Sequence, residues 1–191
     1  MHHLEELHFE RDTEWYDWLL NNYEQKKGVY LIFYKLELKI PTMRWEEAVR
    51  VALCFGWIDS KVQSLGHGKR RQYFCSRNPR GAWSALNKRH VKELIAKGLM
   101  QEPGYKMIEL AKRTGKWTEM DAVENGIIPK DLQNAFENNT VALKNYKNFS
   151  KGYKKSYLAW LHSAKREVTR KKRIDEIIRL CSNNIKSRGN W

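Results

Sequence analysis

The residues of this chain whose types and spacing favour ligand binding are concentrated between Cys54 and Arg89. From residue 60 through 92 the chain has nine basic residues and no acidic one. Guanidinium and ammonium groups beside indole rings can hold an anion or a polar ligand by ion pairing, hydrogen bonding and stacking. We therefore expect a ligand-binding site formed by Trp57, Asp59, Lys61, Arg77, Arg80, Trp83, Ser84 and Asn87.

Two local features indicate how such a site would be organised. Asp59 is the one acidic residue between Glu47 and Glu93, so we expect its carboxylate to form an ion pair with Arg77 or Arg80. Residues 80–84 also precede a predicted helix, and the free N–H groups and dipole of a helix N-terminus attract anions. In the competing interpretation Ser84 caps this helix and Trp83 is buried in the core, and the sequence leaves both open.

Motifs for catalysis and for cofactors are weak. Ser84 lacks a GxSxG context, although Ser84, His90 and Asp59 could assemble in the fold, so an enzyme with its pocket in residues 54–89 stays an alternative. The chain contains neither GxxxxGK[ST] nor GxGxxG, the motifs of phosphate-binding loops. Its six histidines and three cysteines lack the spacing of metal ligands, so we expect neither a metal nor a cofactor.

A second basic block occupies the C-terminal residues. Residues 144–191 contain fourteen basic and three acidic residues, a net charge of +11. A polyanion such as nucleic acid, bound without sequence specificity, or an acidic protein partner would contact Lys165, Arg166, Arg170 and Arg173. In that case we expect the three guanidinium groups to be exposed together and unpaired. The alternative is that these residues form the solvated face of a packed helix.

Composition limits the class of protein. The 191 residues carry a formal net charge of +14, which makes a polyanionic partner plausible. No apolar run approaches the roughly 18 residues that span a bilayer, and the N-terminus lacks the basic and apolar regions of a signal peptide. Cys54, Cys75 and Cys181 are odd in number and form no CxxC motif, which favours reduced thiols. We therefore expect a cytoplasmic protein.

The elements that must position these residues follow from the apolar patterns. Short β-branched and aromatic runs predict strands at 29–34, 58–64 and 70–76, with a hairpin turn at 66–68. Helical spacing predicts helices from Asp12, from Pro41-Thr42 and repeatedly after Pro79. The expected fold is α+β and mostly helical, with a three-stranded antiparallel sheet in the N-terminal half packed on helices. We expect a single domain over 1–191, with a sheet-containing part at 1–100 and a helical part at 101–191.

Several phrases of the chain match the pattern of a known family. The two longest are CFGWIDS at 54–60 and RNPRGAWSALNKRHV at 77–91. Shorter ones follow in the same order at Leu94-Ile95, Gly98-Leu99-Met100, Ala111-Lys112, Gly115-Lys116-Trp117, Ala164-Lys165, Thr169-Arg170 and Arg173-Ile174. Over nearly its whole length the chain resembles the YdeI/OmpD-associated family of bacterial proteins. The resemblance implies a role in protection against bacteriocins or antimicrobial peptides, and it supplies no catalytic residue or cofactor.

Overall fold

The computed structural model describes residues 4–188, which fold into two compact units. The N-terminal unit ends at Thr118, and the C-terminal unit begins at Glu119. Each unit has its own cluster of buried hydrophobic side chains. This boundary lies further along the chain than the one between the predicted parts, 1–100 and 101–191. The single domain over 1–191 stays a prediction.

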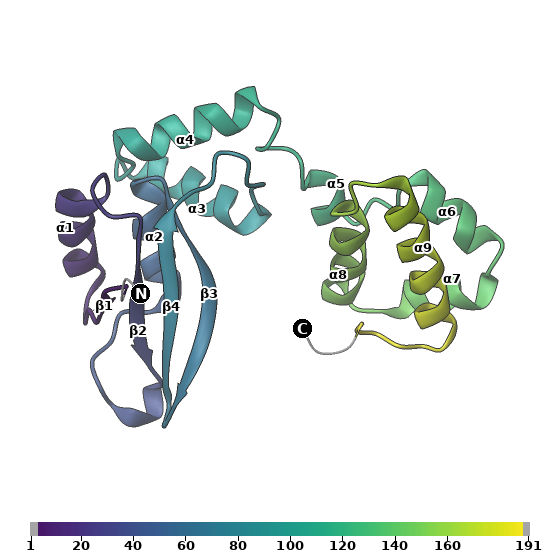
Figure 1. Cartoon of the computed structure of the whole chain (residues 1–191), viewed down its shortest axis with the longest axis horizontal. Coiled ribbons are helices and arrows are strands. Elements are labelled where there is room, and N and C mark those ends of the chain that lie inside the picture. Colours follow the sequence, from purple (N-terminus) through teal and green to yellow (C-terminus); the bar gives the residue numbers. More distant parts are fainter. Residues whose placement is uncertain (1–3, 189–191) are drawn as a thin grey trace. The chain divides into compact units, whose positions relative to one another are not determined.

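The N-terminal unit is built on a four-stranded mixed sheet (Figure 1). Its strands are β1 (Glu6–Leu7), β2 (Gly28–Tyr34), β3 (Trp57–Gly66) and β4 (Lys69–Ser76), in the order β1-β2-β4-β3. The three antiparallel strands are those predicted, so the α+β fold is confirmed. The sequence analysis missed β1, which pairs parallel to β2. A strand of two residues is too short to show an alternating pattern.

Four α-helices complete this unit: α1 (Asp12–Asn22), α2 (Trp45–Cys54), α3 (Ala85–Ala96) and α4 (Glu102–Arg113). Helix α2 contacts α1, α3, α4 and β3, and Figure 1 shows it behind the sheet. Its buried residues include Val49 and Leu53, which join Trp15 and Leu19 of α1 in one hydrophobic core. Helices α3 and α4 belong to this unit because they pack against α2.

Helix α2 begins at Trp45, later than the predicted start at Pro41-Thr42. The Glu47 carboxylate accepts a hydrogen bond from the backbone N–H of Arg44 at 2.7 Å and thereby fixes the helix start. Residues between β2 and this start form a short 3₁₀ turn, η1 (Leu36–Leu38), followed by an irregular segment. The prediction of the helix start was wrong, and the irregular segment becomes one wall of a groove described below.

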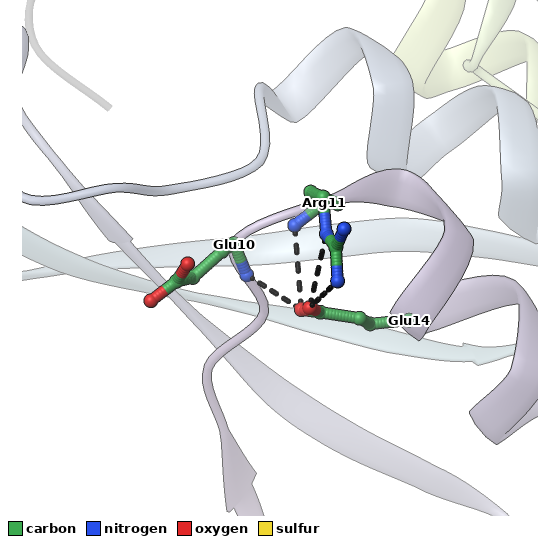
Figure 2. A network of polar contacts seen from close by, with 3 residues as sticks. All are labelled: Glu10, Arg11 and Glu14. Atoms are coloured by element: carbon green, nitrogen blue, oxygen red, sulfur yellow. Dashed lines mark hydrogen bonds and ion pairs between the residues drawn. The ribbon is translucent and has the colours of Figure 1, made fainter.

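A carboxylate of the same kind fixes the start of α1 (Figure 2). Glu14 Oε2 accepts the backbone N–H groups of Glu10 at 3.0 Å and Arg11 at 3.4 Å, and Glu14 Oε1 pairs with the Arg11 guanidinium at 3.0 Å. These contacts lower the pKa of Glu14, chiefly through the Arg11 side chain. Helix α1 is thereby anchored at the end from which Trp15 enters the core.

The C-terminal unit contains only helices within the described residues 119–188. They are α5 (Asp121–Glu124), α6 (Lys130–Glu137), α7 (Thr140–Asn148), α8 (Lys151–His162) and α9 (Glu167–Ser182). Helix α9 contacts α6, α7 and α8. The predicted helical C-terminal part is confirmed. No helix among the described residues is long and apolar enough to cross a membrane.

Candidate functional site

Three of the eight residues predicted to bind a ligand lie inside the core of the N-terminal unit. Trp57 and Trp83 are each 1% exposed, and the Trp57 Nε1–H donates to the Tyr23 carbonyl at 3.2 Å. The Arg77 guanidinium carbon lies 3.7 Å from the centre of the Trp83 ring, a cation–π contact. These residues therefore support the packing of the segment between β4 and α3.

Arg77 is unusual because it is a buried cation that is only partly hydrogen-bonded. Its side chain donates from Nη2 to the Ala82 carbonyl at 2.7 Å, while the buried Nε and Nη1 have no hydrogen-bond partner among residues 4–188. Burial lowers the pKa of Arg77 to about 10, and the charge of Asp59 opposes this shift. Arg77 therefore stays charged at neutral pH, held by its ring contact and one carbonyl.

The predicted ion pair between Asp59 and an arginine is wrong. Asp59 Oδ2 instead accepts hydrogen bonds from Trp45 Nε1 at 2.9 Å and from Gln72 Nε2 at 2.5 Å. No salt bridge within residues 4–188 includes Asp59 or Arg80. The reason is positional, because Asp59 lies opposite Phe74 in the sheet, whereas Arg77 lies beyond the end of β4 and stacks on Trp83.

The remaining predicted residues divide between a helix cap and the surface. Ser84 Oγ accepts the Asn87 backbone N–H at 3.2 Å, so Ser84 caps α3 as the competing interpretation predicted. Lys61 and Arg80 are exposed. None of the eight residues lines either of the two cavities described next. Their shared role as a ligand site stays a prediction, and Asp59 accepts a hydrogen bond from Trp45, which lines the larger cavity.

The larger cavity is an open groove of about 1050 Å³ at one end of the sheet. One wall is the segment from β2 to the start of α2, and the other is the end of the β3–β4 hairpin. We call it the hairpin groove. Its lining residues are Phe33, Tyr34, Lys35, Leu36, Glu37, Met43, Arg44, Trp45, Glu46, Val62, Ser64, Gly66, His67, Gly68, Lys69 and Arg70.

The charged side chains of the hairpin groove are mainly cationic. Lys35, Arg44, Lys69 and Arg70 face two carboxylates, and none of the four cations forms an ion pair with a described residue. The Arg70 guanidinium lies 5.3 Å from the centre of the Phe33 ring. Unpaired cations along a concave wall concentrate positive potential and attract anions.

Trp45 connects the hairpin groove to the predicted central stretch. It is the first residue of α2, lines the groove and is held by its hydrogen bond to Asp59. The sequence analysis missed the groove because its two walls, residues 33–46 and 62–70, are separate segments of the chain. A signal was present in residues 35–40, where charged and aliphatic residues alternate as KLELKI.

A smaller cavity of about 400 Å³ lies between α1, α2 and the end of α3. Among its lining residues are Arg50 and Cys54. Arg50 Nη1 contacts Glu93 at 2.6 Å and the buried His90 Nδ1 at 3.0 Å, so this arginine is engaged in pairing. Burial raises the pKa of the Cys54 thiol to about 11, so the thiol is protonated and a poor nucleophile at neutral pH.

The C-terminal basic block does not present three free guanidinium groups, so that expectation was wrong. Arg170 forms a two-point ion pair with Asp131 of α6, at 2.5 and 2.9 Å. Arg173 donates to the Trp160 carbonyl at 2.5 Å and to Ser163 Oγ at 2.7 Å. Both residues therefore fasten α9 to its neighbours. Lys165 and Arg166 are exposed and have no ion-pair partner among the described residues.

Comparison with known families assigns each unit separately. A family model described as a domain of unknown function (DUF8412) matches residues 7–107, which is more than half of the chain. A second model, OmdA, described as "Bacteriocin-protection, YdeI or OmpD-Associated", matches residues 125–184. No curated protein and no solved structure matches the chain. The chain therefore belongs to the DUF8412 family, and its residues 125–184 match the model of the family that the sequence analysis named as a resemblance.

Proposed function

We propose that the N-terminal unit binds an anionic ligand in the hairpin groove. The observation that carries this proposal is the set of four cations, Lys35, Arg44, Lys69 and Arg70, that line one cavity without ion-pair partners among the described residues. Burying or pairing these charges with an anion would relieve their mutual repulsion. Two partly buried aromatic residues, Tyr34 and Trp45, add surface on which an apolar or planar part of the ligand can pack.

Asp59 takes part in this proposal as a positioning residue. Its carboxylate fixes the indole of Trp45, which fixes the shape of the groove wall at the start of α2. Binding without catalysis is the role that we propose for the unit. Such a ligand-binding function would serve the bacteriocin protection named in the OmdA description. The three cysteines of the chain are free thiols, which supports the cytoplasm as the compartment of the protein.

Isothermal titration with sodium tripolyphosphate, a compact polyanion, tests the proposal. We expect the double variant Lys69→Gln/Arg70→Gln to raise the Kd at least tenfold, about 1.4 kcal/mol, because two groove cations are lost. Binding by the unchanged protein should weaken with added salt, because solvent-exposed charges are screened. Unchanged affinity in this variant would refute the groove as the site.

The matched control is Lys165→Gln/Arg166→Gln, which removes the same charge from the C-terminal unit. These two residues are exposed and unpaired among the described residues, and this observation keeps polyanion binding by the basic block as a second candidate function. If the control variant loses affinity and the groove variant does not, the second candidate is correct. If each variant loses part of the affinity, both blocks contribute.

A further inference from the structure

The end of the N-terminal unit that carries the hairpin groove also exposes several large aliphatic side chains. Leu36, Leu38 and Ile40 are 63%, 42% and 41% exposed, and Val62 on the groove wall is 57% exposed. Single exposed hydrophobic residues are ordinary, but a group at one end of a molecule marks an interaction surface. We call residues 35–40, together with the hairpin turn at 65–69, the tip.

The two segments of the tip hold each other in place. The backbone N–H of Lys35 donates to the Gly68 carbonyl at 2.8 Å. Leu38 packs over Gly68 so closely that a Cβ at this position would lie 2.9 Å from Leu38 Cδ1, and Gly68 has a φ of +70°. Figure 1 shows this end of the sheet on the opposite side of the unit from α4. The exposed aliphatic side chains are therefore presented by an ordered support.

The same end carries an excess of positive charge. Lys35, Lys39, Arg44, Lys69 and Arg70 lie on the tip or in the groove beside it, against the carboxylates of Glu37 and Glu46, which leaves three uncompensated charges. Aliphatic side chains surrounded by lysine and arginine are the combination that binds an anionic membrane interface. Protein interfaces favour aromatic residues and are depleted in lysine, whereas the exposed apolar residues here are leucine, isoleucine and valine.

We infer that the tip docks on the surface of an anionic lipid bilayer. In this arrangement Leu36 and Ile40 enter the boundary between headgroups and acyl chains, and the groove cations contact lipid phosphates. The inference rests on the proposed function of the hairpin groove, and it identifies the bound anion as the phosphate of a lipid headgroup. The contact is reversible and interfacial, because a few aliphatic side chains supply the insertion and the remainder of the affinity is electrostatic.

Co-sedimentation of the full chain with lipid vesicles tests the inference. We expect binding to vesicles of phosphatidylglycerol mixed equally with phosphatidylcholine, and at least tenfold weaker binding to phosphatidylcholine alone. The variant Leu36→Asn/Ile40→Asn should lose at least tenfold in vesicle affinity. The single variant Ile40→Asn, whose side chain does not line the groove, should also weaken vesicle binding while its affinity for tripolyphosphate stays the same. The matched control is Val141→Asn/Val168→Asn, at positions 61% and 68% exposed in the C-terminal unit, and it should bind vesicles normally.

Each remaining outcome decides between explanations. If tripolyphosphate binds in the groove but the mixed vesicles do not bind, the anion is a soluble one and the membrane inference is wrong, while the proposed function survives. If neither binds, both are wrong. Vesicle binding that persists in Leu36→Asn/Ile40→Asn would refute insertion of the tip. Light scattering without lipid measures the oligomeric state as a further check. If the unchanged protein is a dimer and this variant is a monomer, the tip binds a second copy of the chain and the membrane inference is wrong.

Discussion

Asp59 serves two hydrogen-bond donors in the structure and pairs with no arginine. Trp45 belongs to α2 and Gln72 to β4, so a single carboxylate ties a helix start to the sheet. Trp45 is partly buried and Gln72 is buried, and a buried donor without an acceptor loses its bonds to water without replacement. This contact between residues 45, 59 and 72 gives the groove wall its fixed shape.

At the residue scale, we predict that Asp59→Ala lowers the free energy of unfolding by about 1–3 kcal/mol, because two donors lose their acceptor. Urea denaturation measures this change. The effect should be non-additive with Trp45→Phe, which removes one of the donors, and additive within about 0.5 kcal/mol with Arg80→Ala. Arg80 is exposed and serves as the control. A strongly non-additive effect of Asp59→Ala and Arg80→Ala would support the ion pair that the sequence analysis predicted.

Helix α9 shows how element packing redirects a basic sequence. Its arginines at 170 and 173 point to partners on α6 and α8, and the Arg173 guanidinium also lies 5.1 Å from the centre of the Trp160 ring. The contact with Arg170 lowers the pKa of Asp131, with the Arg170 hydrogen bond as the largest cause. The basic block therefore contributes to the assembly of the helical unit as well as to its charge.

At the element scale, we predict that Arg170→Gln and Arg173→Gln each lower the thermal midpoint, whereas Arg166→Gln leaves it nearly unchanged. The Arg170 pair is partly exposed, so its contribution should be at most about 1 kcal/mol. Loss of the Arg173 hydrogen bonds should cost about 1–2 kcal/mol. Calorimetry of the three single variants measures these differences. Equal midpoints for all three would mean that the arginines are solvated.

The pH dependence of the Arg170 effect follows from the lowered pKa of Asp131. A carboxylate whose pKa is lower in the folded state stabilises the fold above its unfolded value of 3.8, and this stability is lost as the pH falls through the folded value. The midpoint difference between the unchanged protein and Arg170→Gln should therefore be constant near neutral pH and shrink in acid. A difference that grows below pH 3.8 would contradict this origin.

The two units of the molecule have separate hydrophobic cores. Leu19 is fully buried in the N-terminal cluster and Leu132 is fully buried in the C-terminal cluster. The two family matches likewise fall on the two units, at residues 7–107 and 125–184. A unit with its own core can unfold as a cooperative unit of its own.

At the scale of the whole molecule, we predict two unfolding transitions in calorimetry. Leu19→Ala should lower the free energy of unfolding of the N-terminal unit alone, and Leu132→Ala that of the C-terminal unit alone. Each change should be about 2–5 kcal/mol, because each substitution leaves a cavity in one core. Tryptophan fluorescence assigns the transitions, since most of the tryptophans precede residue 119. A single transition that both variants shift equally would support the single domain over 1–191 predicted from the sequence.

The sequence by itself determined the α+β class, the three antiparallel strands, the helical C-terminal part and the family resemblance. These follow from local patterns, because alternation, helical spacing, turn residues and short sequence motifs are properties of neighbouring residues. Ser84 as a helix cap was accessible for the same reason.

Only the tertiary structure decided which charges stay free. The central stretch looked like one site because its residues are close in the chain, yet Trp57 and Trp83 are buried, Arg77 stacks on a ring and Arg80 faces solvent. The hairpin groove arises where residues 33–46 meet residues 62–70, and Arg170 is neutralised by Asp131, 39 positions earlier. Ion pairing and cavity formation depend on distances in space, and residue spacing along the chain does not specify those distances.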